Sequence, residues 1–290
     1  MFLPEKIDLH MHTTVSDGTD TPEEILCLVK NAGIQLFSIT DHDAVKAGAM
    51  IRKIRKEGDP AFVTGTEFSC KDEHGKYHIL GYGYDLESPA IRALVKKSHG
   101  YRMDKVIARL DFLRNEFGFT FPEKVIEKLL ALDNPGKPHI GNLMVKYGYA
   151  KSKDTAIDRF VNKCSYKSKY LTPKEAIEGI REGGGISILA HPAFGNGEDM
   201  ILGLEMSRRL DRLIGFGLRG VEAYYSKNTE IILEEMLAFA AEKKLLITAG
   251  SDYHGRNKRV RLGESGCGNA AQGPEGLRRF MEEIQDKILL

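Results

Sequence analysis

The segment from Ile7 to Gly18, IDLHMHTTVSDG, places two histidines and two aspartates at the end of a short apolar run. Side chains alternate across a strand, so His10 and His12 point to the same side and could bind one metal ion together. A single His-x-His pair is equally consistent with a structural role. The positions of the other histidines therefore decide whether this segment belongs to a metal site.

Six of the nine histidines, together with several acidic residues, lie at or near the ends of seven runs rich in β-branched or aromatic residues. We expect these runs to form strands; they are residues 6–9, 36–40, 61–68, 77–84, 186–190, 220–225 and 245–249. The associated polar residues are His10, His12, Asp41, His42, Glu67, His78, His191, Glu222, Asp252 and His254. If these six histidines were unrelated residues of the core, their shared position at one edge would need six separate coincidences. The pattern therefore predicts a metal centre.

Amphipathic stretches separate the expected strands. Two of them begin with Thr-Pro-x-Glu sequences, at Thr21 and Thr172, which predict a capping box with proline in the first helical turn. Strands that alternate with helices are typical of a parallel sheet, and in a closed β/α barrel the loops after the strands carry the chemistry. We therefore expect an α/β barrel with its polar groups at one rim.

Residues 98–169 break this alternation and are expected to form an inserted helical subdomain. The expected helices cover residues 98–116, 122–132, 138–147 and 152–163. The domains predicted are thus a barrel with the metal site, residues 1–97 and 170–290, and a substrate-binding cap, residues 98–169. In the first helix of the cap, Arg102, Lys105 and Arg109 share one face. A basic face of this kind usually contacts solvent, but beside an anionic substrate it could bind phosphate.

Composition excludes several classes of protein. A chain of 290 residues with 42% hydrophobic residues can bury a full core, and its net charge of +1 gives no general attraction to nucleic acid or membranes. No apolar run approaches about 20 residues. The four cysteines are far apart and form no Cys-x-x-Cys pair. We expect a soluble, cytoplasmic, monomeric protein without a membrane or long duplex nucleic acid as partner.

Five short motifs in combination resemble the PHP (polymerase and histidinol phosphatase) family along the length of the chain. They are Asp8-Leu9-His10-Met11-His12-Thr13 with Ser16-Asp17-Gly18, Ile39-Thr40-Asp41-His42-Asp43, Gly65-Thr66-Glu67, Leu189-Ala190-His191-Pro192 and Gly250-Ser251-Asp252-Tyr253-His254-Gly255. The likeness is greatest to bacterial members that act on nucleoside 3′,5′-bisphosphates and short oligonucleotides. The resemblance implies a distorted seven-stranded (β/α) barrel with a helical insertion.

The resemblance also implies a trinuclear site. One ion would be held by His10, His12, Glu67 and Asp252, a second by Glu67, His78 and His191, and a third by Asp17, His42 and His254. Mixed imidazole and carboxylate ligands suit several divalent ions; we favour Mn²⁺, with Fe²⁺, Zn²⁺ and Mg²⁺ as alternatives. Three such ions carry +6 against −3 from the carboxylates, a balance that suits phosphate.

The mechanistic hypothesis is hydrolysis of a phosphate ester by hydroxide generated on the first two ions, while the third holds the phosphoryl oxygens. Glu67, Asp17 and His254 are the residues expected to matter most for catalysis. Asp8, Asp41 and Asp43 flank the ligands and could fix histidine tautomers or simply support turns.

Substrate selection is expected to come from the insertion, where Arg102, Lys137 and His139 resemble the family's substrate-contacting positions. His139 lies at a helix start, whose amides suit a second phosphate. Many relatives carry Arg where this chain has Lys137, which replaces a bidentate group with a point charge. The predicted substrate is a small phosphorylated molecule, above all a nucleoside 3′,5′-bisphosphate.

Several other functions stay open on the sequence alone. Within the family, the alternatives are 5′-3′ exonuclease activity on short RNA and histidinol phosphatase activity. A metal-dependent amidohydrolase also begins with His-x-His, but it would use a bridging lysine at a strand end where this chain has Glu67. A non-catalytic metal-binding scaffold would lack some of the ligands, and none is missing.

Overall fold

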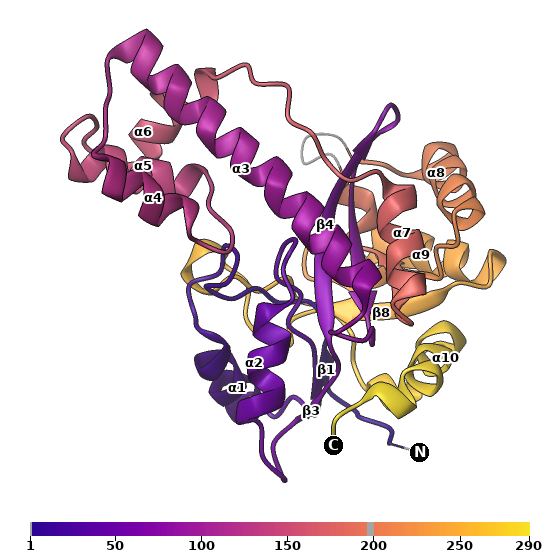
Figure 1. Cartoon of the computed structure of the whole chain (residues 1–290). Helices are drawn as coiled ribbons and strands as arrows, with labels where there is room; N and C mark the ends of the chain where they lie inside the picture. The colour runs from indigo at the N-terminus through magenta and orange to yellow at the C-terminus, as the bar shows by residue number, and fades with distance from the viewer. Residues whose placement is uncertain (1, 196–199) are drawn as a thin grey trace. The chain divides into compact units, whose positions relative to one another are not determined.

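The computed structural model describes residues 2–195 and 200–290, and the chain divides into two compact units. Met1–Val95 and Leu171–Leu290 form the first unit, and Lys96–Tyr170 form the second. Figure 1 shows the course of the chain and the element labels used below. Every predicted metal ligand lies in the first unit.

Among the described residues of the first unit, eight strands form two sheets. Strands β1 (Ile7–Asp8), β2 (Leu36–Phe37) and β3 (Ala61–Phe62) pair in parallel, in that order. Strands β4 (Gly65–Asp72), β5 (Gly75–Tyr82), β6 (Ile186–Leu189), β7 (Gly220–Tyr225) and β8 (Leu246–Gly250) form the second sheet, also in sequence order. In this sheet β5 is antiparallel to both β4 and β6, whereas β6, β7 and β8 are parallel.

The fold is mixed α/β as expected, but a closed seven-stranded barrel is not confirmed. The expected single strand at residues 61–68 is divided at Val63 and Thr64, so that its halves belong to different sheets. Asp72 pairs with Gly75 across a two-residue connection, and so short a connection forces antiparallel pairing. Isolated bridges between Met11 and Tyr253 and between His42 and Glu67 join the edges of the two sheets.

Helices separate or follow the strands of the first unit. They are α1 (Pro22–Asn31), α2 (Lys46–Ile54), α7 (Pro173–Glu182), α8 (Gly203–Gly215), α9 (Glu230–Glu242) and α10 (Glu275–Glu283). Both predicted capping boxes are confirmed: the hydroxyl of Thr21 accepts from the amide of Glu24, and that of Thr172 accepts from the amide of Glu175. In return, the side chain of each glutamate accepts a hydrogen bond from the backbone N–H of its threonine. These bonds satisfy backbone donors at the start of each helix.

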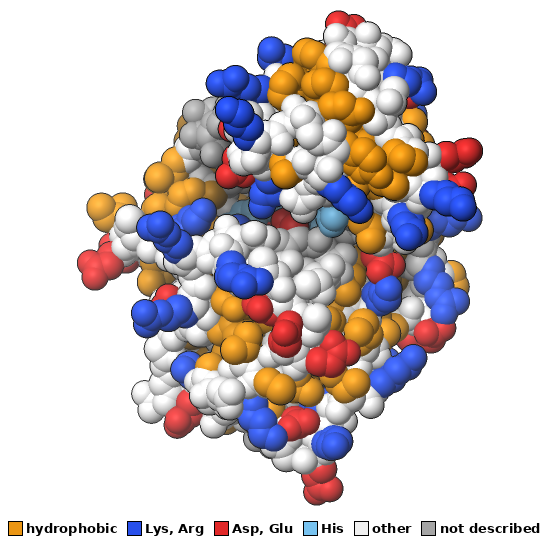
Figure 2. All heavy atoms as spheres, turned by 90° about the vertical axis from the view of Figure 1, so that its left-hand side faces the viewer, with side chains coloured by type: hydrophobic (Ala, Val, Ile, Leu, Met, Phe, Trp, Pro, Cys, Tyr) orange, Lys and Arg blue, Asp and Glu red, His pale blue; other side chains and the backbone are white. Residues whose placement is uncertain are grey.

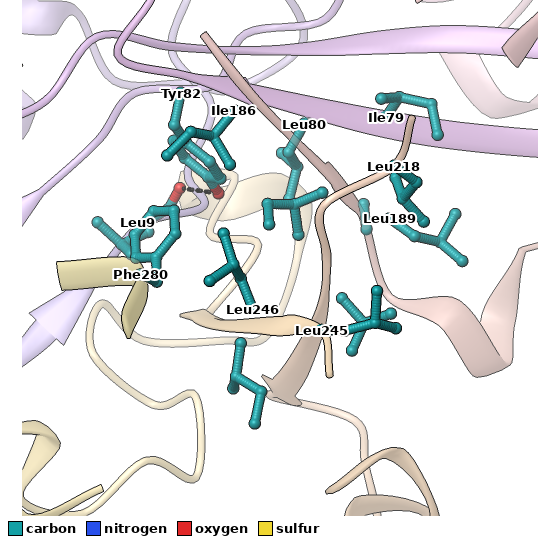
Figure 3. Close-up of a cluster of buried hydrophobic side chains, with 14 of the residues drawn as sticks. Leu9, Ile79, Leu80, Tyr82, Ile186, Leu189, Leu218, Leu245, Leu246 and Phe280 are labelled. Carbon is teal, nitrogen blue, oxygen red and sulfur yellow. Dashed lines mark hydrogen bonds between the residues drawn. The ribbon is translucent and has the colours of Figure 1, made fainter. Parts of the chain in front are cut away.

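The buried core of the first unit fixes the end of β1. Figure 3 shows Leu9, Leu80 and Leu246 converging from three segments, with Tyr82 beside them. Tyr82 is fully buried, and its hydroxyl donates to the carbonyl of Leu9 at 2.8 Å. A buried phenol without a partner would be costly, so this bond stabilises the backbone directly before His10.

Helices also build the second unit. The 29-residue helix α3 (Pro89–Phe117) begins in the first unit, and α4 (Glu123–Leu130), α5 (Lys137–Lys146) and α6 (Lys153–Arg159) follow it. A 3₁₀ helix, Val161–Lys163, occupies the end of the stretch expected to be one helix. Val106, Leu113, Ile140 and Met144 are buried at the centre of this unit.

Charges of both signs are interspersed on the face shown in Figure 2, in agreement with the net charge of +1. Within residues 2–195 and 200–290, no helix combines the length and apolar character needed to cross a membrane.

Candidate metal centre

Glu67 on β4 is surrounded by imidazoles. Its side chain is 1% exposed, and each carboxylate oxygen faces a separate set of histidines. The nitrogens near Oε2 are Nδ1 of His42 at 3.0 Å, Nε2 of His12 at 3.2 Å and Nε2 of His10 at 3.4 Å. The nitrogens near Oε1 are Nδ1 of His78 at 2.9 Å and Nε2 of His191 at 3.1 Å. Burial opposes ionisation, but His78, His42 and His10 lower the pKa of Glu67 well below its usual value, so it is an anion.

His10 and His12 follow β1 and converge as the two-residue alternation predicts. Both are fully buried, and their Nε2 atoms lie 3.2 Å apart. Oδ1 of Asp252, which follows β8, lies 3.6 Å from Nε2 of His10 and 3.5 Å from Nε2 of His12. Two imidazoles and two carboxylates thus share one buried volume at the junction of β1 and β8.

A second set of potential ligands surrounds Asp17. Its Oδ1 lies 3.3 Å from Nε2 of His254 and 3.5 Å from Nδ1 of His12, and its Oδ2 lies 3.8 Å from Nε2 of His42. Burial acts in the opposite direction, but these three imidazoles lower the pKa of Asp17 and keep it anionic. Three groups of ligand atoms result: His10, His12 and Glu67; His42, Glu67 and His78; and His12, Asp17, His42 and His254.

Glu222, inside β7, determines which nitrogen of His10 faces the centre. Its side chain is fully buried, and Oε1 lies 2.8 Å from Nδ1 of His10. Its Oε2 accepts the backbone N–H of His191 at 2.9 Å. A carboxylate accepts from Nδ1–H, so the neutral form of His10 has its lone pair at Nε2, which points toward Glu67 and Asp252.

The protonation pattern of the cluster fits divalent metal ions. Nδ1 of His254 lies 2.8 Å from the carbonyl oxygen of Asp252, which only accepts, so the lone pair of His254 is at Nε2 and faces Asp17. Burial, followed by His254 and His42, lowers the pKa of His12 to about 4, and burial lowers that of His42 to about 4. At His10 and His78 burial acts in the same direction, but Glu222 for His10 and Glu67 for His78 outweigh it and raise the pKa of these imidazoles. The carboxylates thus favour a cation beside these two rings, which is either a proton or a metal ion in its place. The residues present therefore fit the metal ions that the sequence implies.

Comparison with known proteins is consistent with this geometry. Residues 8–171 match the family model described as PHP domain. The chain belongs to the PHP family.

Three relatives carry names that describe phosphoester hydrolysis. The phosphoribosyl 1,2-cyclic phosphate 1,2-diphosphodiesterase of Eggerthella lenta is 30% identical over 87% of this chain and 95% of its own length. A 5′-3′ exoribonuclease of Haemophilus influenzae is 26% identical over 87% of this chain and 91% of its own. The 3′,5′-nucleoside bisphosphate phosphatase of Chromobacterium violaceum is 24% identical over 98% of both chains.

A solved structure supports the fold. The protein from Bifidobacterium adolescentis, assigned as a metal-dependent phosphoesterase, superposes with a TM-score of 0.76 at 26% identity and covers 96% of each chain. Together these comparisons make the chain a phosphoric ester hydrolase of the PHP family, with the metal dependence of that family.

The aspartates flanking the PHP ligands support backbone rather than histidine tautomers. Asp8 accepts from the backbone and hydroxyl of Ser251, from the amide of Gly263 and from that of His10. Asp41 accepts from Thr13 and from the hydroxyl of Ser16. Glu222 sets the tautomer of His10, and the sequence signal for it was a lone carboxylate in the apolar run GVEAYY. Asp41 reaches a ligand ring only through the hydroxyl of Ser16, which lies 3.3 Å from Nδ1 of His12.

Left-handed backbone occurs at two of the expected ligands. Among the described residues, four other than glycine have positive φ, and they include His191 at 28° and Asp252 at 57°. Asp43, next to His42, has φ of 54°. Each such conformation costs of order 1–3 kcal/mol of folding free energy, and such conformations cluster at functional sites. The strain at these residues orients the side chains of His191 and Asp252 at a cost in stability.

The expected substrate-contacting residues all belong to the helical unit. His139 is at the start of α5, and its Nδ1 accepts from the amide of Gly136 at 3.2 Å, which leaves Nε2–H as a donor. Burial, followed by the charge of Arg102, lowers the pKa of His139. The ammonium group of Lys137 donates to the side-chain oxygen of Asn162.

Proposed function

We propose that this PHP phosphoesterase removes phosphate from nucleotides at a trinuclear metal site, with nucleoside 3′,5′-bisphosphates as its favoured substrates. The observation that carries the proposal is the division of ligands around Glu67, whose two oxygens face different imidazoles while Asp17 gathers a third set. Glu67 can therefore bridge two ions, and the Asp17 set can hold another.

The ligand sets would be those expected from the sequence, with two additions. His12 and His42 each lie within reach of two sets, because His12 approaches both Glu67 and Asp17 and His42 does the same. When bound, divalent ions acidify water and neutralise charge on phosphoryl oxygens. The positive charge of three divalent ions would exceed the charge of −3 contributed by Asp17, Glu67 and Asp252. The site would therefore attract an anionic phosphate.

Side-chain exposure indicates the side from which a phosphate enters. His10, His12 and Glu67 are essentially inaccessible, whereas Asp17 is 46% exposed, His78 34% and His42 17%. The exposed members belong to the sets around Asp17 and His78. We infer that the buried set anchors the centre and that the Asp17 set meets the phosphoryl oxygens.

Metal analysis combined with a substrate panel tests the proposal. The purified protein should contain or take up three divalent ions per chain and should release phosphate from adenosine 3′,5′-bisphosphate faster than from AMP or histidinol phosphate. A short 5′-phosphorylated RNA and phosphoribosyl 1,2-cyclic phosphate belong in the same panel. Preference for either of these would replace the bisphosphate assignment, and inactivity with every added metal would favour a non-catalytic scaffold.

Arg102 and His139 are proposed to bind the phosphate that is not hydrolysed. Arg102→Ala and His139→Ala should each raise KM for the bisphosphate by roughly 10- to 100-fold, since a hydrogen bond to a charged group contributes about 1.5–3 kcal/mol. KM for AMP, which lacks the second phosphate, should change much less. Lys137→Ala should have a smaller effect because Asn162 engages its ammonium group.

Arg114→Ala is the matched control for these variants. Arg114 also lies on α3, is 60% exposed and pairs with Asp111. Steady-state kinetics on both substrates provide the comparison. Equal increases of KM for the bisphosphate and AMP would contradict recognition of a second phosphate by Arg102 and His139.

A further inference from the structure

The two oxygens of Asp252 have different surroundings. Oδ1 faces the metal centre, at 3.6 Å from Nε2 of His10 and 3.5 Å from Nε2 of His12. Oδ2 points to two donors that the proposed function does not use: Nζ of Lys258 at 2.6 Å and the hydroxyl of Tyr225 at 3.1 Å. Because both donors reach the same oxygen, the orientation of the carboxylate is fixed.

Both donors are themselves held in place. Tyr225 ends β7 and is 5% exposed, and its ring lies 5.4 Å from that of His191 and 5.7 Å from that of Phe194. Lys258 follows the 3₁₀ helix Gly255–Asn257, and its side chain is 32% exposed. One donor is thus anchored in the sheet and the other in the loop that carries His254.

A carboxylate oxygen has about two lone-pair directions, and two donors on Oδ2 occupy both. An oxygen saturated in this way is a poor additional ligand for a cation. Asp252 can then contribute Oδ1 alone. Ca²⁺ takes six to eight oxygen ligands, including bidentate carboxylates, whereas octahedral Mn²⁺ takes no more than six ligands and Zn²⁺ is usually four-coordinate with imidazole among its ligands.

We propose that Lys258 and Tyr225 are positioning residues that restrict Asp252 to binding through one oxygen and so help the centre to reject Ca²⁺ in favour of transition-metal ions. The inference rests on the proposed metal centre. It concerns the denticity of one ligand and assigns no chemical step to either residue.

The test compares binding of Mn²⁺ and Ca²⁺ by equilibrium dialysis with wild-type protein, Lys258→Met, Tyr225→Phe and Lys258→Arg. Both ions are divalent, so loss of the lysine charge alters their affinities alike and cancels in the ratio. Freeing Oδ2 should lower the preference for Mn²⁺ over Ca²⁺ by roughly tenfold in Lys258→Met, the lower end of effects at outer partners of metal ligands. Tyr225→Phe should shift the ratio in the same direction.

Lys258→Arg keeps a charged donor and should retain the wild-type ratio. Arg259→Met, an exposed neighbour on the same loop, is the matched control and should also leave the ratio unchanged. Wild-type ratios in both Lys258→Met and Tyr225→Phe would overturn the positioning role while leaving the metal centre intact. Failure of wild-type protein to bind either ion would overturn the metal centre together with this inference.

Discussion

Glu67→Gln should abolish phosphate release and free metal from the centre. The substitution keeps the size of the side chain but removes one negative charge and replaces an oxygen with an NH₂ donor. Both oxygens of Glu67 face imidazole nitrogens at 2.9–3.4 Å, so either orientation of the amide loses an acceptor where a shared ligand is needed. The loss of activity should exceed the roughly 100-fold typical of outer partners of metal ligands.

Phosphate release and metal content of the same preparation measure this prediction. Glu73→Gln is the matched control, since Glu73 lies in the β4–β5 connection and its side chain is 81% exposed. That variant should behave as wild type. Phosphatase activity that survives Glu67→Gln would contradict the assignment of Glu67 as the bridging ligand.

Gly250→Ala should disrupt the centre without changing any ligand. Gly250 ends β8, and a Cβ placed there would lie 2.2 Å from Cβ of His10 and 2.4 Å from Oε1 of Glu222. His10 is fully buried and its Nδ1 is engaged by Glu222, so neither neighbour can move freely. We expect a loss of about 1–3 kcal/mol in the free energy of unfolding from overpacking, together with weaker metal binding.

Chemical denaturation and metal titration check the two parts separately. Gly100→Ala is the control, because Gly100 is inside α3 and an added Cβ would meet no atom within 4 Å. That change should stabilise the helix by about 0.5–1 kcal/mol. Normal metal binding by Gly250→Ala would show that the position of His10 does not depend on its packing against β8.

Local signals in the sequence predicted the capping boxes at Thr21 and Thr172 and the convergence of His10 with His12. Each depends on residues at most a few positions apart, and side-chain alternation or helix capping acts over that distance. The structure also gathers the predicted ligands into one cluster. His10, His191 and Asp252 follow the ends of β1, β6 and β8, as expected, whereas Glu67 lies near the start of β4 and His78 lies inside β5.

The change of sheet at Val63 and Thr64 was not predicted, because the run Ala61–Phe68 suits a strand except at Gly65, and a single glycine can equally mark a bulge or a close approach of the backbone. Pairing with different partners divides it: β3 pairs with β2, which lies earlier in the chain, and β4 pairs with β5, which follows it directly. The contacts of Asp252 with Lys258 and Tyr225 were missed for a related reason. Neither donor belongs to a recognisable motif, and tertiary structure alone brings Tyr225 to Asp252.

The bonds between Asp8 and Ser251 join residues 243 positions apart. At a synthesis rate of about 5–20 residues per second, the ribosome needs roughly 10–50 s to produce the serine after the aspartate. During that interval the buried acid and the adjoining histidine motif have no native partner from β8. The β1 segment can therefore complete its native contacts only after Ser251 has been synthesised, so a late folding step follows from the order of the strands.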